Sequence, residues 1–493
     1  MGRYLELQLR CPEAGLCSAG VPVHTCGKDW LVFANLKILL GDGDGIRMAL
    51  EWNGQGGVKP CFRHPNVFKK PRAGEAARAM PPDHVDITSH EPSRFKVWEQ
   101  GEVYHVIDAV LLCSERVARG ELPKARLQEM VEAFGFRPTP NGLLANAALR
   151  ECVDIHSVTR FDWVHTFLSD GVLSTATWIL ISAAESAEIA TQADLNAFLA
   201  QPWGRPKTSS HVGRSLKRIF DDWSAQKNTA HGKVLCSASE MLSLYTMVRL
   251  WVETRLPTAD PRLERQVALF LSACYAVDSI LEGKRQRVPM AEAARNARRH
   301  MIDHMRVLKD VCGISYVRPK HHWAFDVCDQ IEADKCVMDA FTLERLHLRV
   351  RQVADKCVTL STYEATVVAG VISLQADRAA RATCGRATYG RTTHLRGIPG
   401  VLVSDTLSYI GIEFAVGEYV QRAQLEVGFV VACAFEGQTS FLIVDELVKV
   451  DSFSRSSGLW RPNGARSVWT PEGVDNVAAW LSAADGNMLI AFH

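Results

Sequence analysis

Two carboxylates, Asp42 and Asp44, lie in a glycine-rich turn directly after the apolar run Trp30–Leu40. A continuous apolar run that stops at glycines is typical of a buried strand. We therefore expect both carboxylates at the carboxyl end of a strand, where open α/β sheets place catalytic and metal-binding groups. A calcium loop is excluded, since its fifth and twelfth positions would be Ile46 and Asn53. The alternative interpretation is a turn with two solvated aspartates.

Cys61 and His64 have the spacing of one half of a zinc site. The sequence does not identify the second half, and the alternative is a partly buried thiol beside a surface histidine. The other cysteine and histidine residues nearby in the chain are His24, Cys26, His84 and His90.

Asp162 and His165 are three residues apart, so on a helix they share a face. Such a pair can hold a metal ion, or the carboxylate can fix the imidazole tautomer. A structural hydrogen bond at a helix start is an equal alternative. Neither interpretation is favoured by the sequence alone.

Glu344 lies in a predicted helix beside Arg345 and Arg349. A glutamate among cations is typical of an exposed ion pair, which contributes little to stability. The same pattern would suit a metal-binding carboxylate close to a phosphate backbone. Both interpretations stay open.

Arginines gather in two places that could follow a phosphate backbone. One is the predicted helix Pro289–Val311, and the other is an Arg-, Gly- and Thr-rich stretch over residues 376–400 that we predict to be a linker. A solvated helix face and a solvated linker are the alternatives. The candidate DNA-binding arginines are Arg295, Arg298, Arg299 and Arg306 on the helix, Arg345 and Arg349 beside Glu344, and Arg378, Arg381 and Arg386 in the linker.

The composition is that of an ordinary globular protein. The 493 residues are 47% hydrophobic and 23% charged, with a formal net charge of +1, which excludes a disordered chain and a histone-like polycation. The charged N-terminus predicts no signal peptide, and the most apolar stretch, Val172–Ala184, is too short to cross a membrane. Fourteen irregularly spaced cysteines favour a reducing compartment, the nucleus or cytoplasm.

Periodicity predicts helices through the middle of the chain and strands at its end. Apolar stripes predict helices over Pro123–Phe134, Val172–Ala187 and Leu263–Leu281, and Ser237 with Glu240 predicts a capping box that begins another. The C-terminal residues 401–493 predict a small antiparallel β-barrel. Its expected strands are Tyr409–Val416, Leu425–Phe435 and Ser440–Val448, closed by a short helix over Pro471–Leu481.

Five segments, taken in order, resemble the motifs of DDE transposases of the Plavaka/CACTA group. They are ILLGDGDG, KPCFRH, DIHSVTRFDWVHTFLSDGVL, RPKHHWAFDV and FTLERLHLRV. The chain is also similar to multicopy transposase-derived proteins of dinoflagellate algae.

The resemblance implies an RNase H-like core that performs Mg²⁺-dependent cleavage and joining of DNA. It implies Asp42 and Glu344 as two of three acidic ligands, within about 10 Å of each other, with Asp162 and His165 as an auxiliary pair. The first acidic ligand of the family has no counterpart here. We therefore expect a truncated, inactive relative that at most binds nucleic acid.

The resemblance and the periodicity together predict an α/β plus α plus β chain. The predicted parts are a partial RNase H-like core (1–103), an α-helical insertion (104–316), a final core segment (317–375), the linker (376–400) and a C-terminal β domain (401–493). An SH3-like barrel there would suggest protein contacts, by fold analogy alone. The alternative function is a non-enzymatic interaction protein on a helical scaffold, stabilised by zinc through Cys61 and His64.

Overall fold

The computed structural model is mixed α/β, with an antiparallel sheet in the C-terminal region. It describes residues 6, 9–10, 17, 21–25, 28–69 except 34, 83–99, 101–201, 203, 232–341 except 259, 388–394 and 401–491, the last with gaps at 410–411, 423–425, 437–438, 453–456, 472–473 and 483–487.

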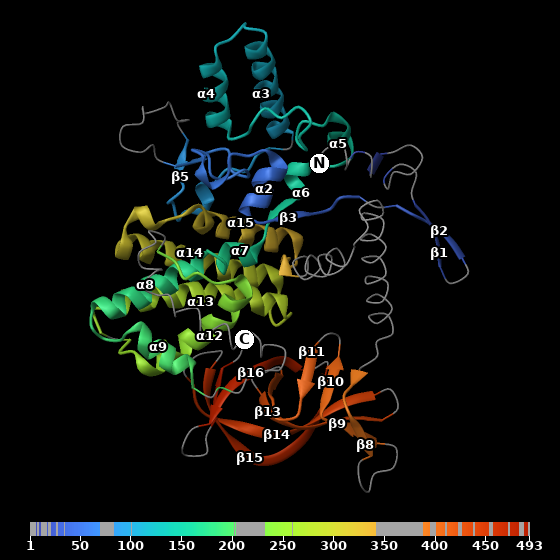
Figure 1. The fold of residues 1–493 in the computed structure, drawn as a ribbon, viewed down its shortest axis with the longest axis vertical. Helices are drawn as coiled ribbons and strands as arrows, with labels where there is room; N and C mark the ends of the chain where they lie inside the picture. Colours follow the sequence, from blue (N-terminus) through green and yellow to red (C-terminus); the bar gives the residue numbers. More distant parts are fainter. Residues whose placement is uncertain are drawn as a thin grey trace, which may run out of the picture. The chain divides into compact units, whose positions relative to one another are not determined.

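The chain divides into two compact units, each built from two stretches of sequence. Unit 1 comprises residues 1–167 and 275–340, and unit 2 comprises residues 168–274 and 341–493. The predicted helical insertion, residues 104–316, is therefore shared between the two units. Figure 1 labels the helices and strands of each unit.

Unit 1 contains short strands where one long buried strand was predicted. A hairpin of β1 (Val21–Thr25) and β2 (Lys28–Val32) is followed by β3 (Leu39–Gly41). The prediction of one strand was wrong because the apolar run is not buried: Leu31 is 56% exposed and does not pack in a core. Asn35 also interrupts the run, since its side chain accepts a bond from the Leu36 amide and offers the backbone an alternative to a strand ladder.

A two-stranded parallel sheet joins two segments of unit 1 that are far apart in the sequence. Strand β3 pairs with β6 (Thr159–Phe161) in parallel register. Each strand runs directly into a short helix: β3 into α2 (Gly43–Leu50) and β6 into α7 (Trp163–Phe167). A second parallel pair joins β4 (Val67–Phe68) to β5 (Val85–Asp86).

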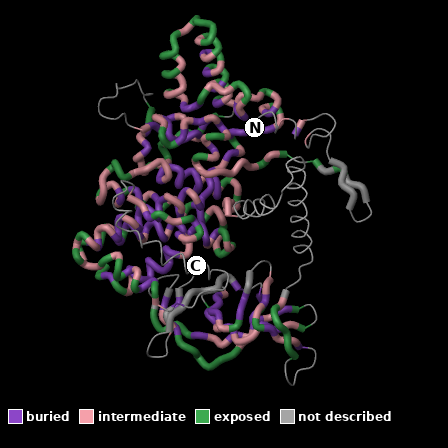
Figure 2. The backbone as a smooth tube through the Cα atoms, viewed as in Figure 1, coloured by how far each residue is buried: buried purple, intermediate pink, exposed green. Residues whose placement is uncertain are grey.

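Helices supply the rest of unit 1. Helices α3 and α4 form a hairpin (Figure 1) whose outer positions are exposed (green in Figure 2), and Gly135, at φ 83°, ends α4 as a left-handed cap. Helix α14 packs along α15, and the buried residues of α14 recur about once per helical turn. The helices are α3 (Glu102–Ala118), α4 (Lys124–Phe134), α5 (Ala147–Cys152), α6 (Ile155–Val158), α14 (Met290–Cys312) and α15 (Pro319–Asp334).

The helices of unit 2 begin where the sequence signals them. Helix α12 (Ala238–Arg255) opens with the predicted capping box, in which Ser237 and Glu240 satisfy each other's backbone amides. The other two are α8 (Val172–Ser186) and α9 (Gln192–Leu199), while α13 (Glu264–Lys284) crosses the boundary between the units. The stretch Trp163–Ser186 is long and apolar enough to span a membrane, but 78% of its most apolar window is buried, as in a core helix.

Six C-terminal strands close into a ring. Hydrogen-bonded neighbours follow the order β12, β16, β17, β15, β14 and β13, and β13 pairs back to β12. Strand β9 extends the sheet from β13 and carries β8, while β7, β10 and β11 form a separate three-stranded sheet. The ring strands are β12 (Tyr419–Arg422), β13 (Glu426–Glu436), β14 (Thr439–Ser452), β15 (Ser457–Trp469), β16 (Val474–Ser482) and β17 (Met488–Ala491), and the others are β7 (Thr388–Tyr389), β8 (Thr392–His394), β9 (Val401–Ser404), β10 (Thr406–Tyr409) and β11 (Ile412–Ala415).

The helix predicted over residues 471–481 was wrong, because residues 474–481 lie in strand β16. It bonds to β12 on one side and β17 on the other, so it is one of the strands of the ring. Local helix preference is weak compared with the backbone pairing gained by closure.

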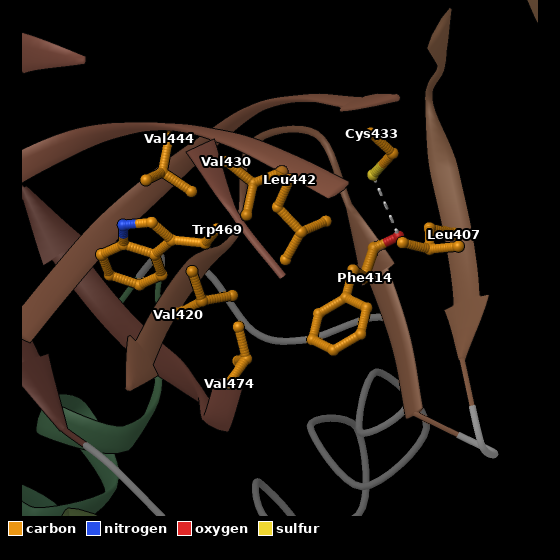
Figure 3. Close-up of a cluster of buried hydrophobic side chains, with 9 residues drawn as sticks. All are labelled: Leu407, Phe414, Val420, Val430, Cys433, Leu442, Val444, Trp469 and Val474. Atoms are coloured by element: carbon orange, nitrogen blue, oxygen red, sulfur yellow. Dashed lines mark hydrogen bonds between the residues drawn. The ribbon is translucent and has the colours of Figure 1, made fainter. Parts of the chain in front are cut away.

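The barrel core is organised around Trp469, which is 2% exposed (Figure 3). Gly428 is required beside it, because a Cβ there would lie 2.9 Å from Val444 and 3.1 Å from the Trp469 ring. The Cys433 thiol contacts the Phe414 carbonyl at 3.8 Å on the other side of the core. The remaining buried members are Leu407, Val420, Val430, Leu442 and Val474.

We predict that Trp469→Ala destabilises the barrel by about 3–5 kcal/mol, because it removes the largest buried ring of this core. Hydrogen exchange at the β13 and β14 amides of the full chain measures this loss. The neighbouring Val468→Ala is the matched control, since Val468 is 63% exposed and its truncation should leave exchange within about 0.5 kcal/mol of the parent. Equal effects of both changes would contradict this description of the core.

Candidate metal centre and acidic strand edge

Asp42 is the N-cap of helix α2. Its carboxylate accepts the Gly45 amide at 2.6 Å, and the N-terminal end of a helix favours a negative charge there. The glycine is needed, because a Cβ at position 45 would lie 2.9 Å from the Asp42 oxygen. Asp44 lies in the first turn and pairs with Arg47 on the surface at 3.1 Å. The predicted position after a strand is thus confirmed for Asp42.

Asp162 occupies the equivalent position after the neighbouring strand. Gly41 lies opposite Phe161 in the β3–β6 register, and the Asp162 amide donates to the Gly41 carbonyl at 2.9 Å. Asp42 and Asp162 therefore follow the ends of adjacent parallel strands. We call this pair the acidic edge.

The Asp162 carboxylate is fully buried and already has its donors. It accepts the backbone amides of Val164, His165 and Ala340 at 3.3, 3.2 and 3.1 Å. The His165 ring nitrogen Nδ1 lies 2.5 Å from the same carboxylate, which is the contact that the spacing predicts. Four donors match the four lone-pair sites of a carboxylate, so the group serves as a helix cap.

A buried cluster of four side chains has the donor set of a metal centre. Its members, which we call the metal-ligand cluster, place one ligand atom each within 4.8 Å of all the others. Cys61 and His64 are the predicted half-site, and the second half comes from helix α15. The four residues are Cys61, His64, His322 and Asp326.

Several distances within the cluster are close to the edges of a tetrahedron of metal ligands. With bonds of about 2.0 Å to nitrogen or oxygen and about 2.3 Å to sulfur, ligand atoms lie roughly 3.3–3.6 Å apart. Here Nδ1 of His64 lies 3.0 Å from Nε2 of His322 and 3.5 Å from the Cys61 sulfur. Oδ2 of Asp326 lies 3.3 Å from the sulfur and 3.9 Å from Nε2 of His322, while Oδ1 lies 3.5 Å from Nδ1 of His64.

Indole N–H groups fix the loop that carries Cys61 and His64. Residues 59–64 form neither helix nor strand, yet most of them are buried, so their carbonyls need partners inside the protein. Three tryptophans supply them: Trp52 donates to Lys59, Trp323 to Pro60 and Trp98 to Phe62, at 3.1, 2.9 and 2.8 Å.

Helix α15 supplies the other two ligands from one face. His322 and Asp326 are four residues apart, so one helical turn brings both side chains to the loop. Arg63 adds a charge beside the cluster, with its guanidinium 3.6 Å from the Asp326 carboxylate and bonded to the Asp326 carbonyl at 3.3 Å. The ring of Phe95 covers both imidazoles, with ring centres 5.4 Å from His64 and 4.6 Å from His322.

Burial favours the uncharged forms of the four side chains. It raises the pKa of Asp326 to about 7 and raises the pKa of the Cys61 thiol well above its usual value, to which Asp326 adds. It also lowers the pKa of His322 to about 3, assisted by Arg63, and holds the pKa of His64 well below its usual range, assisted by His322. Neutral imidazoles are the form that binds metal ions.

The predicted basic face of α14 divides into paired and exposed arginines. Arg298 is bonded to both Asp329 and Glu332 at 2.7 Å, so its charge is directed into unit 1. Arg295 and Arg299 are exposed. Arg306 is exposed and lies 3.6 Å from Asp303. Glu344, Arg345, Arg349, Arg378, Arg381 and Arg386 lie outside the described residues, as does the expected approach of Glu344 to Asp42.

Sequence reasoning missed His322, Asp326 and the buried Lys59. The first two lie in the segment RPKHHWAFDV, where a histidine and an aspartate four residues apart on a helix were the available signal. Lys59 is 3% exposed and lies over the Trp98 ring at 4.6 Å, and burial lowers its pKa to about 8. Its neighbourhood of aromatic residues is visible only in the fold.

No family model, curated protein or solved structure matches the chain.

We predict that the affinity of the cluster for a divalent metal ion, tested with zinc as the probe, rises steeply with pH and changes slope near pH 7. A metal ion must displace the Cys61 proton throughout this range, and below about pH 7 it must also displace the Asp326 proton, whereas both imidazoles are already neutral. Affinity should rise about a hundredfold per pH unit from about pH 5.5 to 7, and about tenfold per unit above it. Competition with a chelator, corrected for the chelator's own protonation, measures both slopes, and a flat profile would contradict the ligand set.

Proposed function

We propose that this chain is a transposase-derived protein that no longer cleaves DNA, binds nucleic acid, and is held in shape by a structural zinc ion. One observation carries the proposal. Two of the segments that resemble transposase motifs, KPCFRH and RPKHHWAFDV, meet in the metal-ligand cluster although His64 and His322 are 258 residues apart.

The ligand set favours zinc over calcium or magnesium. A thiolate and two imidazoles are borderline or soft ligands that suit zinc, whereas hard cations require oxygen ligands. The charges also balance, because a divalent ion with one thiolate, one carboxylate and two neutral imidazoles forms a neutral centre. Neutrality matters at a site where all four side chains are at most 1% exposed.

The burial of the ligands indicates a structural rather than a catalytic ion. Catalytic zinc keeps a position open for water or substrate, while structural zinc has four protein ligands. All four ligands come from the protein here, and Phe95 lies against two of them. Such an ion would hold the loop of residues 59–64 to helix α15.

The acidic edge supports descent from an enzyme and the loss of its activity. Carboxylates at the ends of adjacent parallel strands are what a metal-dependent nuclease core needs, in keeping with the resemblance. Asp162 nevertheless has all its lone-pair sites occupied by N–H donors, which leaves none for a second metal ion. The C-terminal barrel is the candidate site for protein contacts, which is the alternative function.

We predict that the purified chain holds one zinc ion per molecule and that Cys61→Ala loses it. Removal of the thiolate takes away one of the four ligands, so the midpoint of thermal unfolding should fall as well. Elemental analysis with a thermal scan measures both. Cys328→Ala is the matched control, because Cys328 is equally buried, lies on α15 and is not a member of the cluster. Zinc that persists in Cys61→Ala would disprove the assignment.

We predict weak, salt-sensitive DNA binding without nicking or strand transfer in Mg²⁺ or Mn²⁺. Changing Arg295 and Arg299 to alanine should reduce the slope of log affinity against log salt by about one for each phosphate that is no longer neutralised. Arg298→Ala is the control, since its charge is already paired inside unit 1.

Titration of labelled duplex at several salt concentrations, with a plasmid nicking assay, tests this prediction. Metal-dependent cleavage that disappears in Glu344→Gln would show an intact active site and refute the proposed loss of activity. Binding that the arginine changes leave untouched would exclude the α14 face.

A further inference from the structure

We propose that Trp323 couples metal occupancy of the metal-ligand cluster to the structure of the acidic edge. The inference rests on the proposed zinc centre and goes beyond it, because it assigns to the ion an effect on a second site. Trp323 is 1% exposed and lies between the two sites.

One side of Trp323 is tied to the metal ligands. It directly follows His322 on helix α15, and its indole N–H donates to the carbonyl of Pro60 at 2.9 Å. Pro60 directly precedes Cys61. The ring is thus anchored next to one ligand on the helix and next to another on the loop, and an ion that joins these ligands fixes both anchors.

The other side of Trp323 contacts both halves of the acidic edge. Its ring stacks on Phe161, with centres 4.7 Å apart and planes inclined by 15°, and Phe161 directly precedes Asp162. The ring edge also fills the space above Gly43, which follows Asp42: two ring carbons lie 2.5 Å from where a Cβ would be. A single rigid side chain therefore touches a neighbour of each carboxylate.

Because the core is closely packed, a movement on one side of Trp323 displaces the residues on its other side. A buried indole has few alternative positions in a core packed to crystal-like density, so a shift of α15 against the loop must move Phe161 or the start of α2. Those movements would disturb the caps made by Asp42 and Asp162. The two amides that report on the caps are those of Gly45 and His165.

Hydrogen exchange with and without a zinc chelator tests the coupling in the full chain. Chelation should speed exchange of the Gly45 and His165 amides about tenfold. In Trp323→Phe, which keeps all four ligands, zinc should still bind but the chelator should no longer change exchange at these two amides.

Trp98→Phe is the matched control, because Trp98 also donates an indole N–H to the loop, at Phe62, and makes no ring contact with Phe161. It should keep the full response to chelation. A response that survives in Trp323→Phe, or that is lost equally in Trp98→Phe, overturns the proposal.

Two further outcomes separate this inference from the zinc proposal. If the chain holds zinc but chelation leaves the acidic edge unchanged, the coupling is refuted and the zinc centre stands. If the chain holds no zinc, both fail. A parallel rise of exchange throughout helix α3 would show global unfolding and would also refute the coupling.

Thermodynamic linkage supplies a second test that leaves Trp323 and the ligands intact. A coupling that lets zinc order the acidic edge must let the edge alter zinc affinity by the same factor. Gly43→Ala would push a methyl group into the Trp323 ring, so it should weaken zinc binding about tenfold. Gly56→Ala, whose Cβ would meet nothing within 4 Å, should leave the affinity unchanged, and equal affinities in the two variants would overturn the proposal.

Discussion

The buried loop of residues 59–64 is the constraint on which the arrangement of unit 1 depends. A backbone segment that is neither helix nor strand cannot satisfy its own carbonyls, and a buried unpaired carbonyl costs about 1–3 kcal/mol. The three indole donors come from three separate parts of the chain: residue 52 after α2, residue 98 before α3, and residue 323 on α15. Satisfying this one loop therefore brings together the segments that build the metal-ligand cluster and the acidic edge.

Incomplete hydrogen bonding among the buried ligands indicates that an ion would stabilise the metal-ligand cluster. Among the described residues, Oδ1 of Asp326 is a buried polar atom without a hydrogen-bond partner. Two neutral imidazoles also face each other at 3.0 Å, a contact in which only one ring can donate. A divalent cation would use the ring nitrogens and the carboxylate as ligands, which replaces poor hydrogen bonding by coordination. Nδ1 of His322 would then be the outward nitrogen, which in metal sites commonly donates to a second partner.

The features that could be predicted from the sequence are local ones, which depend only on residues that lie a few positions apart in the chain. The start of α12 follows from Ser237 and Glu240, and the Cys61–His64 half-site follows from a spacing of three. His322 and Asp326 are themselves only four residues apart, but their pairing with that half-site could not be predicted this way, because they meet it only after the intervening chain has folded. The strand at residues 474–482 was missed for the same reason, since its pairing partners are set by closure of the barrel. The run at residues 30–40 was misjudged because apolar composition alone does not show whether a segment is covered.

The acidic edge and the metal-ligand cluster differ in the balance between acceptors and donors. Asp162 has four N–H donors for its four lone-pair sites, so a cation placed there would have to displace bonds worth about 1–3 kcal/mol each when buried. Asp326 has a carboxylate oxygen with no donor, although Arg63 lies 3.6 Å away. An ion at the cluster would therefore give the unpaired oxygen of Asp326 a partner. An ion at Asp162 would instead displace hydrogen bonds that this carboxylate already makes. This difference favours the cluster over the strand edge as a place for a metal ion, while the carboxylates of the strand edge cap helices.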